Sequence, residues 1–208
     1  MVALAASAGG ADPLLRALAR LVAAEDTATG HRPDAEGERD RPARQRIAHL
    51  VARLAAAVTA GGVAGHRTAA VRAGELLGGT DGFVPQAAHL AVQALDLDAA
   101  PGVLVCELER LAELHAGRPA LAARTASALH DRLGVRRPPG DPLVLLLAAE
   151  RLAADGGHAG GLLAVAVTAA LGRRTGWTEE WRTVLRSLRC HARPDVRDAA
   201  LALTTAAE

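Results

Sequence analysis

Arginine is the residue with which this chain could do the most chemistry, because the sequence contains no lysine and arginine supplies every strongly basic side chain. Its most regular pattern lies near the C-terminus, at Arg182, Arg186, Arg189 and Arg193. On one helix these positions would form a single basic stripe. Guanidinium groups bind phosphate and carboxylate groups through paired hydrogen bonds. The spacing indicates a surface for an acidic partner, or else a solvated face neutralised by neighbouring acids.

Two tryptophans lie on a different stripe of the same segment. Trp181 shares helical spacing with Val184, Leu185 and Leu188, so we expect it in the core. Trp177 begins the segment, and we expect it to be partly exposed. Trp177 therefore joins the four arginines as a candidate partner-binding residue.

Glu109 and Glu113 are the best-spaced carboxylate pair in the sequence. Residues four apart share a helix face, which is the arrangement that acid–base work by two carboxylates needs. Glu107 and Arg110 form an ordinary pair three residues apart on the same segment. We therefore expect a solvated charged face here, with acid–base chemistry as the alternative.

The remaining residues give no cofactor, metal or catalytic motif. Without lysine there is no P-loop lysine and no Schiff base, and the three serines form no nucleophile elbow. No two of the eight histidines have zinc-helix spacing, and Cys106 and Cys190 make no metal motif. The glycine clusters at 61–65 and 156–161 are predicted to be turns. We expect no cofactor, no metal and no enzymatic activity, a helical-bundle enzyme built from scattered His and Glu being the alternative.

Composition predicts an all-α protein. Half of the 208 residues are apolar, nearly all of them Ala, Leu and Val, while aromatic residues make up 1%. Ala, Leu and Arg favour helices, and strand-favouring residues are scarce. The narrow composition is typical of GC-rich, actinobacterial-type coding. The net charge of +1, two cysteines, and the absence of a signal segment or a long apolar run predict a cytoplasmic protein without a membrane span.

Helical periodicity and Gly/Pro breaks predict about ten helices in a single domain over residues 1–208. The first runs from Asp12–Pro13 to Gly30, and a charged loop at 31–46 separates it from the second. Two apolar segments, 143–152 and 160–171, are expected at the centre of the core. The hairpin starts at Pro101, Pro142 and Trp177 lie 41 and 35 residues apart. This interval indicates stacked helical hairpins, with a globular helical bundle as the alternative.

The last hairpin, residues 177–208, resembles a HEAT repeat. The resemblance is carried by Leu185 and Leu188, by the turn Arg193-Pro194-Asp195, and by Val196-Arg197 and Ala200, which open the second helix. His191 stands where the family has an aspartate six residues before that arginine, so the bond to the turn backbone is left open. The resemblance covers about 30 residues and implies a right-handed α-solenoid whose inner face binds a partner.

Together these observations predict a non-catalytic helical-repeat scaffold or adaptor that binds another protein. The alternative is a HEAT-like nucleic-acid binder, similar to the HEAT-like DNA glycosylases, with the arginine stripe on phosphates. The candidate partner-binding residues are the same in both hypotheses, and they are Arg182, Arg186, Arg189, Arg193 and Trp177.

Overall fold

The computed structural model describes residues 41–60, 64–79, 81–135 and 140–205, together with the isolated helical residues 17, 20, 21, 23, 24 and 27. The chain divides into two compact units, Met1–Ala94 and Leu95–Glu208. The described residues form nine α-helices and one short 3₁₀ turn, and contain no strand. The all-α prediction is confirmed, and the count is nine in this part of the chain instead of about ten. The predicted single domain over residues 1–208 stays a prediction.

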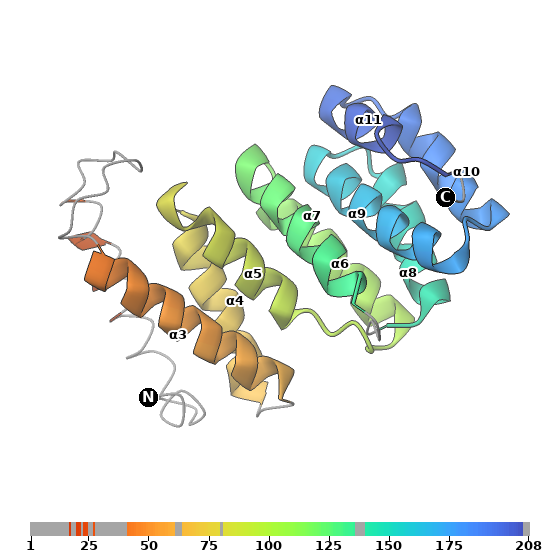
Figure 1. Cartoon of the computed structure of the whole chain (residues 1–208). Helices are drawn as coiled ribbons and strands as arrows, with labels where there is room; N and C mark the ends of the chain where they lie inside the picture. Colours follow the sequence, from red (N-terminus) through yellow and green to blue (C-terminus); the bar gives the residue numbers. More distant parts are fainter. Residues whose placement is uncertain are drawn as a thin grey trace. The chain divides into compact units, whose positions relative to one another are not determined.

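Among the described residues, the first unit contains three α-helices and the 3₁₀ turn (Figure 1). These elements are α3 (Arg41–Thr59), α4 (Ala64–Gly78), the turn Asp81–Phe83, and α5 (Val84–Ala94). The helices α4 and α5 approach closely because Gly74 lies against the backbone of α5, where an added Cβ would be 3.4 Å from the Ala87 carbonyl oxygen. Ile47 and Phe83 are fully buried and fill the space that the alanines leave.

The second unit contains six helices, and their starts follow from the sequence. Four of them begin with proline in the first turn, where the missing N–H costs nothing. In α8 the side chain of Asp141 also accepts a hydrogen bond of 2.8 Å from Leu143 N. The six are α6 (Pro101–Leu114), α7 (Pro119–Leu133), α8 (Pro142–Ala154), α9 (His158–Thr175), α10 (Glu179–Arg189) and α11 (Pro194–Leu201).

These six helices form two layers of the second unit. The helices α6, α8 and α10 pack in sequence in one layer, and α7, α9 and α11 pack in the other. Hydrogen bonds between neighbouring helices of a layer join residues that lie 36 to 42 positions apart in the sequence. The α6 and α8 segments are joined by Gly140 N to Asp98 and by Arg151 to Glu109, both 42 residues apart. In the other layer, His130 with Ala166 and His158 with Asp195 are 36 and 37 residues apart. These hydrogen bonds link neighbouring helices within each layer of the second unit.

The helix α9 is the centre of the second unit's core. Residues 163–172 of this helix are all buried, as the apolar sequence predicts. The helix α8, which the same reasoning placed beside it, is covered on one side only. Leu145 and Leu152 are buried, but Leu143 is 74% exposed and Leu147 is 45% exposed. The expectation that α8 is covered on several sides is wrong for this face.

The predicted charged loop at 31–46 is corrected in part, and the predicted first helix lies mostly outside the described residues. The helix α3 begins at Arg41, so residues 41–46 of the predicted charged loop are helical. Pro42 lies in its first turn, a position at which proline is compatible with a helix. Residues 31–40 of that loop and most of the predicted first helix lie outside the described residues. In the part of the chain that the structure covers, no helix is long and apolar enough to cross a bilayer.

Candidate functional site

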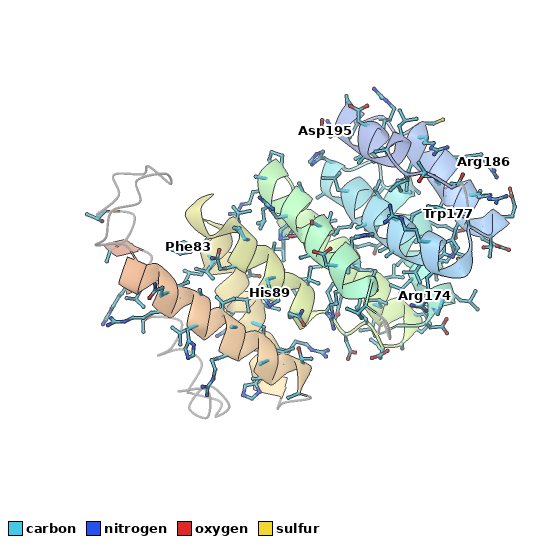
Figure 2. All side chains as sticks on the ribbon, in the orientation of Figure 1. Phe83, His89, Arg174, Trp177, Arg186 and Asp195 are labelled. Carbon is cyan, nitrogen blue, oxygen red and sulfur yellow. The ribbon has the colours of Figure 1, made fainter. Side chains whose placement is uncertain are left out.

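The four candidate arginines do not form one uniform stripe. The helix α10 ends at Arg189, so Arg193 lies beyond it, as the residue that precedes α11. Arg186 binds Glu179 at 2.6 Å and the Thr183 hydroxyl at 2.9 Å. Figure 2 shows Arg186 on the outer side of the C-terminal hairpin. The partner of Arg186 is seven residues, or about two turns, earlier on its own helix, and it neutralises this part of the stripe.

The Arg189 side chain binds the backbone of the same hairpin and does not point freely into solvent. Its Nη2 donates to the Leu203 carbonyl oxygen at 2.7 Å, and its Nε donates to the Ala200 carbonyl oxygen at 3.3 Å. Ala200 lies in the last turn of α11, where its carbonyl oxygen also accepts from Leu203 N at 3.3 Å, and Leu203 lies two residues beyond the helix end. Arg189 therefore caps α11, while Arg182 and Arg193 carry exposed guanidinium groups.

Trp177 is buried against α9 instead of partly exposed. It is 6% exposed, and its ring lies so close to Gly172 that an added Cβ there would be 2.5 Å from Cζ3. Figure 2 shows the side chain beside α9. The chain reaches this position because Gly176 and Trp177 both have positive φ, and Trp177 N bonds the Gly172 carbonyl oxygen at 2.7 Å. Trp177 thus closes the end of α9, and Trp181 is buried as expected.

His191 supplies the turn contact that the sequence left open. Its Nδ1 accepts a hydrogen bond of 3.1 Å from Arg193 N, and its carbonyl oxygen accepts one of 3.0 Å from Arg197 Nη1. Burial lowers the pKa of His191, and Arg193, Arg197 and His158 lower it further. The acceptor Nδ1 requires the neutral ring, and these surroundings favour that form.

The second unit contains a cleft of about 490 Å³ where the ends of its three hairpins meet. One wall is the end of α6, another is the turn from α8 to α9, and Arg193 comes from the turn between α10 and α11. A volume of this size is typical of small-ligand sites. The lining residues are Glu109, Ala112, Glu113, His115, Ala116, Gly117, Leu152, Asp155, Gly157, His158, Ala159, Gly160 and Arg193.

Glu109 and Glu113, the pair that the sequence singled out, both line this cleft. Glu109 accepts hydrogen bonds from Arg151 Nη2 and Nε at 3.2 and 3.3 Å. Glu113 and Asp155 have no such partner among the described residues. The cleft therefore offers two carboxylates for binding, and Glu109 is already engaged.

Two histidines complete the cleft. His158 Nε2 lies 3.2 Å from Asp195 Oδ2, which joins the start of α9 to the start of α11. His115 is 7% exposed, and its Nδ1 has no hydrogen-bond partner among the described residues. Burial lowers the pKa of His115 to about 4, and Arg118 contributes to the shift. At neutral pH this ring is therefore uncharged.

Sequence reasoning missed His115, Asp155 and His158 as members of one site. They come from α6 and from the α8–α9 turn, so no local spacing connects them. The described residues contain no group of three or more His, Cys, Asp or Glu side chains placed to hold a metal ion. Cys106 and Cys190 are free and exposed.

A second surface of this unit is apolar. Val103 on α6 is 52% exposed, and Leu143 and Leu147 on α8, which packs on α6, are 74% and 45% exposed. We call Val103, Leu143 and Leu147 the α6–α8 apolar surface.

Comparison with known proteins finds no matching family, no similar curated protein and no similar solved structure. The described residues therefore define the class of protein only as all-helical.

Proposed function

We propose that this chain is a non-catalytic helical-repeat scaffold or adaptor that binds another protein through the second unit. The observation that carries the proposal is the α6–α8 apolar surface. Three aliphatic side chains on two neighbouring helices are about half exposed or more. Clustered exposed apolar groups are typical of protein interaction sites, because their burial by a partner is favourable.

The packing of α6 to α11 in two layers supports a HEAT-like α-solenoid as the architecture behind this function. Nearly constant separations of 36 to 42 residues between bonded positions are expected when each hairpin packs on the next in the same way. The free cysteines are compatible with the reducing cytoplasm. The proposed partner is a protein, and the binding requires no cofactor.

The alternative, a nucleic-acid binder, has less support from the arginines. Arg186 is neutralised by Glu179 and Arg189 caps α11, so two of the four candidate arginines have intramolecular partners. Phosphate binding by several arginines would make affinity fall steeply with salt. Duplex DNA titrated at 50 and 200 mM salt separates the two functions, because a steep dependence would favour the nucleic-acid binder.

The test of the scaffold proposal is capture of a partner with the full chain and with two variants. Leu143→Gln/Leu147→Gln removes most of the α6–α8 apolar surface, and Leu201→Gln changes an equally exposed leucine on α11. We expect a specific protein from native-host extract to bind the wild type and Leu201→Gln but not the double variant. Circular dichroism checks that all three are folded. Undiminished capture by the double variant would refute this surface, and the absence of any specific partner would refute the function.

A further inference from the structure

Among the described elements of the first unit, α3 is the most basic. It contains four arginines and no acid. Residues 41–94 contain six arginines against two acids, a formal charge of +4, whereas the whole chain has +1. The positive charge is therefore concentrated in this segment. A local excess of charge attracts polyanions even when the whole chain is nearly neutral.

The face of α3 that carries this charge is opposite to its packed face. Ile47 and Leu54 are buried, and α3 packs on α4 and α5. Arg46, His49 and Arg53 are exposed, and their spacing of three and four residues places them together on the opposite face. We call these three residues the α3 basic face.

The two arginines of the α3 basic face have no intramolecular partner. Neither Arg46 nor Arg53 takes part in an ion pair or a hydrogen bond among the described residues. Arg186 and Arg189, by contrast, are bound within their own hairpin. A helix rises about 1.5 Å per residue, so Arg46 and Arg53 lie about 10 Å apart along α3. Their guanidinium groups are therefore available for two separate anionic groups.

The other side chains on this face argue against several kinds of anionic partner. Ala48, Ala52 and Ala56 are exposed on α3 beside the charged residues. A helix that lies on an anionic membrane inserts large apolar side chains, and a folded protein partner needs an apolar core at its interface. Single-stranded nucleic acid stacks its bases on aromatic residues, but Phe83, the one aromatic residue of the first unit, is buried. The backbone of a nucleic-acid duplex needs none of these features, because it presents closely spaced phosphates.

We propose that the α3 basic face binds the phosphate backbone of a nucleic-acid duplex without reading its sequence. Arg46 and Arg53 each bind a phosphate through charge-assisted hydrogen bonds, and His49 offers a ring N–H between them. The small alanines let the backbone approach the helix closely. This contact belongs to the first unit, so it is separate from the α6–α8 apolar surface and from the arginines of α10.

The first test measures how binding depends on salt. A short fluorescein-labelled DNA duplex is titrated with the full chain at 50 and 200 mM salt, and binding is followed by fluorescence anisotropy. Two phosphate contacts predict that the affinity falls about 10-fold between these concentrations. A duplex of unrelated sequence should bind equally well. No saturable binding at 50 mM salt, or an affinity that salt does not change, would overturn the proposal.

The second test uses matched variants with the same change of charge. Arg46→Gln/Arg53→Gln removes both arginines of the α3 basic face, and Arg182→Gln/Arg193→Gln removes two exposed arginines of the second unit. We expect the first variant to bind at least about 10-fold more weakly at 50 mM salt and to lose about two units from the slope of log affinity against log salt. The second variant should bind like the wild type, and circular dichroism checks that both are folded. Equal losses in both variants would show attraction by net charge alone and sink the assignment to α3.

Competition experiments identify the class of partner. Poly-glutamate, vesicles of anionic phospholipid and single-stranded DNA are compared with the duplex at equal concentration of negative charge. Tightest binding of a duplex supports the proposal, and tighter binding of any of the other three would overturn it. An RNA duplex in the same series shows which nucleic acid is preferred. The Leu143→Gln/Leu147→Gln variant should bind the duplex like the wild type, so failure of the partner-protein proposal does not decide this one.

Discussion

At the residue scale, two glycines near the ends of α9 let side chains from neighbouring segments lie against its backbone. Gly172 lies under the Trp177 ring, and Gly161 lies under Val196, where an added Cβ would be 2.7 Å from Cγ2. Neither contact has a local signature, because glycine is also a common turn residue. The sequence pattern predicts the turns that follow α8 and α9, and it does not reveal which glycine a tryptophan needs.

We predict that Gly172→Ala destabilises the protein by about 1–3 kcal/mol, because the new methyl group overlaps the Trp177 ring. Trp177 cannot move aside easily, since its backbone has a positive φ of 56° and bonds Gly172. Urea unfolding measures the change. The control is Gly102→Ala on α6, where the methyl group meets no atom within 4 Å. A similar loss in both variants would indicate a general intolerance of alanine instead of this contact.

His115 gives the second prediction at this scale. Its folded-state pKa of about 4 lies below the ordinary value of 6.5, so the unfolded chain binds a proton first as the pH falls. Stability is unaffected above about pH 6.5 and decreases towards pH 4. We expect a loss of about 1–2 kcal/mol from this group after solvent screening.

Urea unfolding at pH 7.5 and 5.5 measures that loss, and His115→Gln is the comparison. The variant should lose less stability between the two pH values than the wild type. The variant should keep part of the pH dependence of stability, because the pKa of His191 is also lowered. Burial lowers it most, and Arg193, Arg197 and His158 lower it further. If both proteins lost the same unfolding free energy between pH 7.5 and 5.5, a buried neutral His115 would be contradicted.

At the element scale, the arginines of the C-terminal hairpin have different roles, although their spacing predicts one common basic face. The helix α10 begins at Glu179 because Gly176 and Trp177 take left-handed backbone conformations that end α9. It ends at Arg189, so Arg193 belongs to the next turn. Helical spacing predicts a common face, but only the helix ends decide which arginines remain on it.

We predict that Arg189→Ala destabilises the protein by about 1–2 kcal/mol, because the Leu203 carbonyl oxygen loses its donor and the Ala200 carbonyl oxygen keeps only a backbone donor. Arg186→Ala removes an exposed ion pair and should change stability by about 0–1 kcal/mol. Hydrogen exchange of α11, with urea unfolding, measures both. Faster exchange in α11 for Arg189→Ala alone is expected. Equal effects would contradict the capping role.

At the scale of the whole molecule, the two compact units give a prediction about folding. The second unit, Leu95–Glu208, has its own buried core around α9 and hydrogen bonds that link its successive hairpins. We predict that residues 95–208 expressed alone are helical and unfold cooperatively in urea. Circular dichroism measures both properties.

A shorter fragment, residues 142–208, is the matched control. It keeps α8 to α11 but loses α7, which packs closely on α9. We expect it to be markedly less stable, because the buried face of α9 becomes exposed to water. Non-cooperative unfolding of residues 95–208 would contradict an independent second unit, and equal stability of both fragments would contradict the importance of α7.

The sequence by itself determined the helical class, the starts of α6 at Pro101 and of α8 at Pro142, and the burial of α9, whereas it placed Pro194 in a turn and the structure begins α11 there. These features depend on local propensity, proline geometry and apolar periodicity, all of which can be counted along the chain. It also identified Glu109 and Glu113 as a pair on one face.

Only the tertiary structure decided what surrounds these faces. It buried Trp177 on Gly172, assigned Arg189 to the end of α11, and left Leu143 and Leu147 without cover. It also brought His115, Asp155 and His158 into one cleft with the glutamates. The physical reason is that a helix pattern specifies which side chains share a face, whereas exposure and proximity depend on contacts between residues far apart in the chain.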